Sequence, residues 1–174
     1  ILFRKSAFRA LRLPWTFSSF FSSTEWTKLV SRLPLPMRMM LAAKAALRSG
    51  AGLVFLGVPQ SIYAIEAIKL DEAIVFPLPE EDGKLSERAL DEILRRLPQM
   101  DAILIGPGLG QSCGVLTVVS KVLEAFSGPV IVDADGINVL STHRDILRGR
   151  TAPTILTPHA GEFERIFPEY TSNR

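Results

Sequence analysis

The chain has little of several residues that mark whole classes of protein. Its 174 residues include one cysteine, Cys113, which excludes an internal disulfide and favours a reducing compartment. It has two histidines, His143 and His159, neither with a second histidine or cysteine close in sequence, so no zinc site is indicated. No Gly-Lys-Ser/Thr sequence occurs, which excludes a P-loop. No apolar run reaches the roughly 20 residues that a membrane-spanning helix needs.

Acidic residues are nearly missing from the first 50 positions. Nine Lys/Arg stand there against one acid, Glu25, a net charge of +8, so the rest carries −6 of the total +2. Basic segments can indicate nucleic acid or a membrane surface, but these cations form no helical stripe, and we expect neither partner. The Arg-, Ser- and Phe-rich composition of residues 1–36 resembles an organellar transit peptide, so organellar import is an alternative to the expected cytoplasmic location.

Beyond residue 37, segments with helical periodicity alternate with short apolar runs typical of strands. Helices are predicted over residues 39–48, 61–70, 86–97, 114–126 and 138–147, and strands over residues 53–58, 73–76, 101–105, 130–135 and 154–157. Strands that alternate with helices predict an α/β fold with a parallel, doubly wound sheet. Before this, Pro34 and Pro36 are expected to interrupt any regular element, and Pro59 and Pro77 to end strands.

Three predicted strands end in flexible or polar residues. These are, in chain order, Gly106, Gly108, Gly110, Asp133, Asp135, Asn138, Thr157, His159 and Glu162. The carboxyl ends of parallel strands lie on one edge of a sheet, where open α/β sheets bind small molecules. Glycine lets the backbone approach a ligand closely. We therefore expect one site at this edge, with residues 106–110, hereafter the glycine loop, as its floor.

Each motif alone also has a structural interpretation. The glycine loop is typical of a tight strand-to-helix turn. Asp133 and Asp135 can cap the next helix, orient a hydroxyl or hold Mg²⁺, and His159 can cap a helix. We expect Cys113 to be buried incidentally and His143 to lie on the surface.

Four blocks, residues 41–54, 104–110, 130–138 and 155–163, in this order and spacing resemble the ADP- or ATP-dependent NAD(P)H-hydrate dehydratases. These are repair enzymes of the ribokinase-like superfamily. The resemblance implies an α/β, three-layer ribokinase-like (Rossmann-like) fold with a mostly parallel central sheet, incomplete at the C-terminus. It implies a partial dehydratase domain over residues 39–174. Residues 1–38 are then an atypical segment, disordered or foreign to the family.

The resemblance also implies a lyase activity. The family restores hydrated NADH or NADPH to NAD(P)H by phosphorylating the ring hydroxyl from ADP or ATP, with Mg²⁺, and then expelling phosphate. It places Gly108 and His159 against the hydrated dinucleotide, with Asp133, Asn138 and Glu162 shaping the cleft beside Gly106 and Gly110. The implied partners are this small-molecule substrate and the nucleotide, with a possible homo-oligomer.

Two family features are not found. The catalytic aspartate of a Gly-Asp motif, and a Lys-Gly segment ahead of it, do not occur up to Arg174. We therefore assign no catalytic residue, expect that aspartate beyond Arg174, and expect little activity from the chain alone. The family also has a glycine-rich loop ahead of the first helix, in which a small residue meets the substrate. This chain has residues 36–39 at that place, and residues 31–32 can be a remnant of the loop.

Two alternatives to a partial dehydratase are a ribokinase-like small-molecule kinase and a non-catalytic nucleotide-binding remnant.

Overall fold

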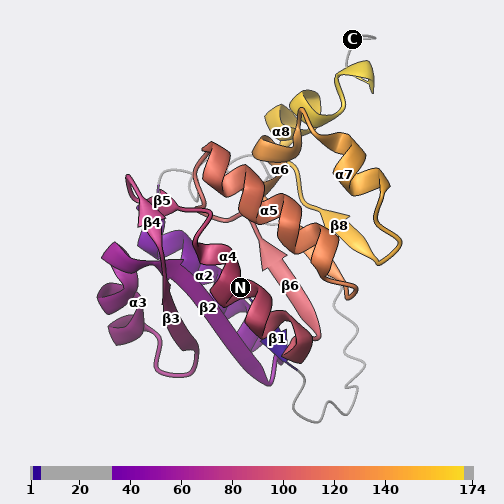
Figure 1. Ribbon diagram of the computed structural model, residues 1–174. Helices are drawn as coiled ribbons and strands as arrows, with labels where there is room; N and C mark the ends of the chain where they lie inside the picture. Colours follow the sequence, from indigo (N-terminus) through magenta and orange to yellow (C-terminus); the bar gives the residue numbers. More distant parts are fainter. Residues whose placement is uncertain (1, 5–32, 171–174) are drawn as a thin grey trace, which may run out of the picture.

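The computed structural model describes residues 2–4 and 33–170. Figure 1 shows a central sheet with helices on its faces. The strands are β1 (Leu2–Arg4), β2 (Leu53–Pro59), β3 (Ile74–Leu78), β4 (Glu80–Glu81), β5 (Lys84–Leu85), β6 (Ala102–Ile105), β7 (Val130–Val132) and β8 (Thr154–Leu156). The helices are α2 (Leu35–Arg48), α3 (Tyr63–Lys69), α4 (Ala89–Arg96), α5 (Cys113–Ala125), α6 (Asp135–Leu140), α7 (Arg144–Arg148) and α8 (Ala160–Ile166), with short 3₁₀ turns η1 (Gln60–Ile62), η2 (Leu97–Gln99) and η3 (Pro168–Tyr170).

The main sheet has six strands in the order β3-β2-β1-β6-β7-β8. The pairs β2–β3, β6–β7 and β7–β8 are parallel, while β1 runs antiparallel to both of its neighbours. A mostly parallel sheet with crossover helices is the predicted architecture. The strands β4 and β5 form a separate hairpin that projects beside α3 in Figure 1.

The strand β1 lies where no regular structure was expected. Leu2 is opposite Phe55 of β2 and Ile103 of β6, and its side chain is buried. Three residues carry too little periodicity to be recognised as a strand, because the alternation that marks a strand needs at least four. The rest of the segment expected to be irregular, residues 5–32, lies outside the described residues.

Helices cover the two faces of the sheet. On one face α4, α5, α6 and α8 bury a core that includes Ile93, Val118, Val122 and Ile137 against β6 and β7. On the other face α2 and α3 pack over β2 and β3, around a smaller cluster that includes Met39 and Leu56. The side chains of β2 alternate between these faces, since successive residues of a strand point in opposite directions.

Several element boundaries differ from the prediction for local reasons. Pro36 lies inside the first turn of α2, where the missing N–H of proline costs no hydrogen bond. Pro77 lies within β3, which is tolerated because β3 is an edge strand. The helix predicted over residues 138–147 is two helices, α6 and α7, separated at residues 141–143.

Two helices have local features that their sequences explain. Gly50, with φ +93°, follows the end of α2, and the bonds from its N–H to Leu47 O and from Ala51 N–H to Ala46 O complete a Schellman motif. The predicted apolar face of the helix over residues 86–97 packs into the larger core. Among the described helices, none is long and apolar enough to cross a membrane.

Candidate functional site

The three predicted strand ends meet at one edge of the sheet and are joined by hydrogen bonds. Asp135 accepts a hydrogen bond from the Gly110 N–H at Oδ2, over 2.9 Å. Asp133 accepts one from the Thr157 hydroxyl at Oδ1, over 2.8 Å. The ends of β6, β7 and β8 are thus connected through the side chains that follow β7. The predicted convergence of these residues is confirmed in the geometry.

The glycine loop turns sharply after β6. Its three glycines have φ values of +130° at Gly106, +75° at Gly108 and +69° at Gly110, a region that side chains rarely adopt. A Cβ built on Gly106 would lie 1.7 Å from the backbone oxygen of Asp133. The hydrogen of Gly106 therefore faces the end of β7, and this residue serves the close approach of two strand ends.

A lysine from the β4–β5 hairpin covers the other side of the glycine loop. The aliphatic carbons of Lys84 lie 3.3–3.4 Å from the position that a Cβ on Gly110 would occupy. The Lys84 Nζ donates to the backbone oxygen of Gln111 over 3.1 Å. The loop is therefore held between Lys84 and Asp135. Sequence reasoning missed Lys84, because an isolated lysine in an acidic turn gives no signal of a distant contact.

The turn between β7 and α6 is strained. Ala134 has φ +46° and ψ −118°, a combination that costs a residue with a Cβ roughly 1–3 kcal/mol. Next to it, Gly136 packs closely under the glycine loop, since an added Cβ would lie 3.0 Å from the Ile105 oxygen and 3.1 Å from the Gly106 Cα. Strain and close packing both hold Asp133 and Asp135 at the strand ends.

Replacing Ala134 by glycine is expected to stabilise the protein. The relieved strain is partly offset by the extra freedom of glycine in the unfolded chain, roughly 0.5–1 kcal/mol, which leaves a gain of up to about 2.5 kcal/mol. Urea unfolding measures this difference. The matched control is Ala45→Gly on an exposed position inside α2, which is expected to lose about 1 kcal/mol. A loss of stability in both variants would contradict strain at Ala134.

His159 and Glu162 form a reciprocal cap at the start of α8. The His159 Nδ1 accepts the N–H groups of Gly161 and Glu162 over 3.1 and 3.3 Å, and Glu162 Oε2 accepts the His159 N–H over 3.0 Å. Because Nδ1 is an acceptor, the neutral ring carries its proton on Nε2. This atom lies 3.3 Å from Glu162 Oε1, and the side chain is 41% exposed. The Nε2–H group is thus available to a ligand.

Of the two remaining candidates, one is placed differently from expectation. Cys113 is exposed, so its predicted burial is wrong; it is the first residue of α5, whose N-cap is Ser112. His143 is partly buried, with Nδ1 2.9 Å from the Thr142 hydroxyl. In the described ranges no group of three or more His, Cys, Asp or Glu residues is arranged to hold a metal ion.

An apolar cavity of about 60 Å³ lies beneath the glycine loop, and its lining includes residues from both faces of the sheet, such as Met39 of α2 and Val118 of α5. Its walls include Leu56, Gly57, Ile103 and Leu109, with Gly106 at the loop end. It holds no charged lining residue, so a polar ligand would bind above the loop and not in this cavity.

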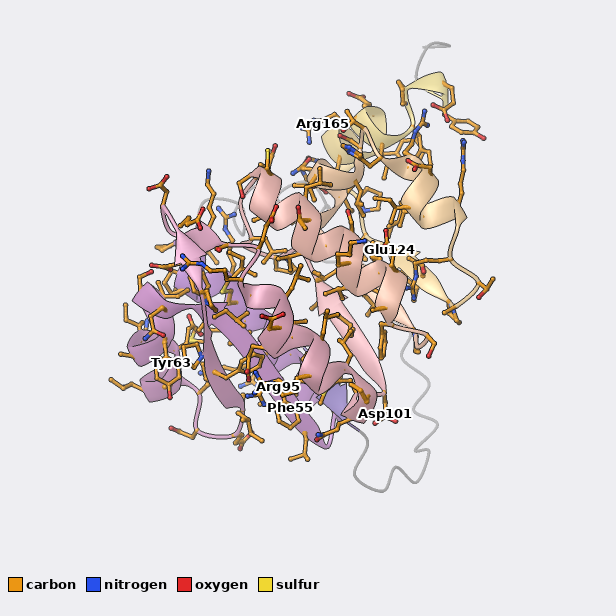
Figure 2. All side chains as sticks on the ribbon, viewed as in Figure 1. Phe55, Tyr63, Arg95, Asp101, Glu124 and Arg165 are labelled. Atoms are coloured by element: carbon orange, nitrogen blue, oxygen red, sulfur yellow. The ribbon has the colours of Figure 1, made fainter. Side chains whose placement is uncertain are left out.

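Arg165 of α8 is a further residue at this edge that sequence reasoning did not single out. It donates from Nη1 to Asn138 Oδ1, which adds a second link, between α8 and α6, to the one from Thr157 to Asp133. Figure 2 shows Arg165 at the end of the molecule where α6 and α8 lie. In the sequence, Arg165 could be linked to this edge only by its position three residues after Glu162, which places both on the same side of a helix.

Comparison with known proteins identifies the family of this chain. A family model described as NAD(P)H-hydrate dehydratase matches residues 38–174. The bifunctional NAD(P)H-hydrate repair enzyme Nnr of Moorella thermoacetica is 43% identical over 127 residues, 72% of this chain and 24% of that protein. The enzyme of the same name from Salinibacter ruber is 44% identical over 133 residues, 75% of this chain and 24% of that protein. The chain thus spans about a quarter of the length of these relatives.

Solved structures show the same fold. A hypothetical protein of Streptococcus mutans aligns with a TM-score of 0.63 and 29% identity, over 78% of this chain and 46% of that one. A ribokinase-like superfamily protein of Enterococcus faecalis V583 aligns with a TM-score of 0.62 and 24% identity, over 75% of this chain and 43% of that one. The match of the family model over most of the chain leads to one conclusion: the chain belongs to the NAD(P)H-hydrate dehydratase family.

Proposed function

We propose that this chain binds hydrated NADH or NADPH at the edge formed by β6, β7 and β8. It would take part in the ADP- or ATP-dependent dehydration that restores NAD(P)H. The observation that carries the proposal is the joining of the glycine loop, Asp135 and α8 by hydrogen bonds at one sheet edge. Membership of the dehydratase family supports the choice of substrate.

The proposed roles follow from what each group can offer. Gly108 lies in the sharpest part of the glycine loop and has no side chain to keep a dinucleotide away from the backbone. His159 offers the Nε2–H donor, which a hydroxyl or phosphate oxygen can accept in place of Glu162. Asp133, Asn138 and Glu162 already accept hydrogen bonds from protein donors, so we propose that they shape the cleft. Gly106 and Gly110 would hold the loop in place.

The phosphoryl donor, ADP or ATP, is a second substrate in this proposal. Hydroxide is a poor leaving group, and phosphorylation of the ring hydroxyl converts it into a good one. Both Asp133 and Asp135 are used in hydrogen bonds, and no metal cluster is found among the described residues. The residues present therefore do not fit a resident Mg²⁺ ion, and we propose that Mg²⁺ arrives with the nucleotide.

His159→Asn tests the proposed site without removing the helix cap, since asparagine is a preferred N-cap residue. Calorimetry of the chain with NADPH hydrate is expected to show binding that this substitution weakens about tenfold, or 1.4 kcal/mol, because the Nε2–H donor is lost. The control His143→Asn changes the other histidine, away from the strand ends, and is expected to leave binding unchanged.

Three outcomes separate the alternatives. Binding of ADP without the hydrate would favour a small-molecule kinase, for which a substrate screen would follow. Binding of neither ligand would indicate an inactive remnant and overturn the proposal. Recovery of NADPH from its hydrate with ADP or ATP, measured on the same chain, is expected to be slow or undetectable, because the Gly-Asp and Lys-Gly motifs of the family do not occur in it.

A further inference from the structure

A continuous series of hydrogen bonds runs from α8 to the glycine loop. Arg165 Nη1 donates to Asn138 Oδ1. Asn138 Nδ2 donates to Asp135 Oδ1 over 3.4 Å. Asp135 Oδ2 accepts the Gly110 N–H over 2.9 Å. Three parts of the edge, α8, α6 and the glycine loop, are therefore connected through three side chains. The far end of the series, Arg165, lies outside the proposed ligand contacts.

The direction of these bonds follows from the chemistry of the groups. A guanidinium has donors only and a carboxylate has acceptors only. The Asn138 amide lies between them and can satisfy both in one orientation alone, with its oxygen toward Arg165 and its NH₂ toward Asp135. In the flipped orientation an amide oxygen would face the carboxylate. Arg165 and Asp135 thus together determine which way the amide points.

The 3.4 Å bond between Asn138 and Asp135 is the longest in the series and therefore the weakest. Without Arg165, the amide would lose the charged partner that orients it, and Asp135 would be free to turn away from Gly110. Arg165 also lies beside the first turn of α8, where a Cβ on Gly161 would be 3.7 Å from its Nη2. The same guanidinium therefore bonds to Asn138 of α6 and lies beside the first turn of α8, which His159 caps.

We propose that Arg165 is a positioning residue for the glycine loop. It orients the Asn138 amide, which holds Asp135 on the Gly110 N–H and keeps the loop in the conformation that receives the dinucleotide. The part of the inference that concerns the ligand rests on the proposed function. The part that concerns the loop does not, because it is a statement about hydrogen bonds within the protein.

The loop is tested first, without any ligand. Hydrogen exchange of the Gly110 amide, followed by NMR, is expected to be on the order of tenfold faster in Arg165→Met than in the unsubstituted chain. Exchange of Val119 and Leu123 amides in α5 should not change, which separates a local effect from a loss of global stability. Arg165 is an exposed residue, so the variant should fold. Unchanged Gly110 exchange would overturn the proposal.

Further variants make the result specific. Asn138→Ala should accelerate Gly110 exchange as Arg165→Met does, and the double variant should add nothing further, since both break one series. Arg165→Lys retains a cationic donor and should restore part of the protection. The matched control is Lys121→Met, which breaks the exposed Lys121–Glu124 ion pair on α5, and Figure 2 shows Glu124 far from Arg165. Additive effects in the double variant would contradict a single series of hydrogen bonds from Arg165 to Gly110.

Ligand binding is tested second. NADPH hydrate should bind the unsubstituted chain and bind Arg165→Met several-fold more weakly, with partial rescue in Arg165→Lys. Equal binding by all three would overturn the role of Arg165 in ligand binding while leaving the proposed function intact. Failure of the unsubstituted chain to bind would overturn the proposed function, and the Gly110 exchange result would still decide the positioning role.

Discussion

Gly106→Ala is expected to destabilise the protein by at least about 3 kcal/mol, and the chain can fail to fold altogether. The added methyl would lie 1.7 Å from the Asp133 backbone oxygen, which cannot move freely because it accepts the Gly136 N–H over 2.9 Å. The positive φ of +130° adds strain for any side chain. Denaturant unfolding followed by circular dichroism measures the loss.

Gly83→Ala separates the clash from the backbone conformation. Gly83 also has a positive φ, +72°, but a Cβ there meets nothing within 4 Å. Only the left-handed conformation is then penalised, by about 1–2 kcal/mol. Equal losses at the two positions would show that the end of β6 can move away from β7, and that the close approach at Gly106 is not essential.

Glu66→Leu is expected to stabilise the protein by about 1–3 kcal/mol at neutral pH. Glu66 is fully buried on the inner side of α3, and neither carboxylate oxygen has a hydrogen-bond partner among the described residues. A buried polar group without a partner retains the cost of leaving water. Leucine has a similar size and no such cost. Urea unfolding at pH 7 compares the variant with Glu72→Leu, an exposed position where a change within about 0.5 kcal/mol is expected.

The same carboxyl makes the gain depend on pH. Burial raises the pKa of Glu66 above its ordinary value, and the charge of Lys69 opposes this shift only in part. Between the unfolded and folded pKa values the folded state binds more protons, so this group lowers stability as pH rises. Below the unfolded pKa the carboxyl is protonated in both the folded and the unfolded state, so it adds no pH dependence to the stability. The gain in free energy of unfolding from Glu66→Leu should therefore grow as pH rises above about 4.5. A gain that does not change with pH would contradict a raised pKa of the buried Glu66 carboxyl.

The parts of the fold predicted from the sequence are those set by local pattern. The run of residues 53–58 is a strand because it is apolar and bounded by turn residues. The strand predicted over residues 130–135 ends at Val132, because Asp135 already begins α6. The convergence of Asp135, Asn138 and His159 followed from parallel strands alone, since their carboxyl ends share one edge. A glycine directly after a helical pattern, as at Gly50, likewise favours a helix end at that position.

The remainder depends on contacts that no local pattern records. Arg165 and Lys84 reach the glycine loop from distant segments, and each is an ordinary surface residue in the sequence. Glu66 is buried while Ile68 beside it on α3 is 80% exposed, the reverse of what polarity predicts, because the packing of the whole helix sets its orientation. Pro77 stays within a strand because of the place of β3 at the edge of the sheet.

The position of β1 has a consequence for how the chain folds. Within the sheet, β2–β3 and β6–β7–β8 are two parallel sets built from neighbouring segments, and β1 is the strand that joins them. Its partners are about 50 and 100 residues away along the chain. Closing such long loops costs entropy that one short strand repays poorly. The two parallel sets are therefore expected to form early, and their union through Leu2–Arg4 late.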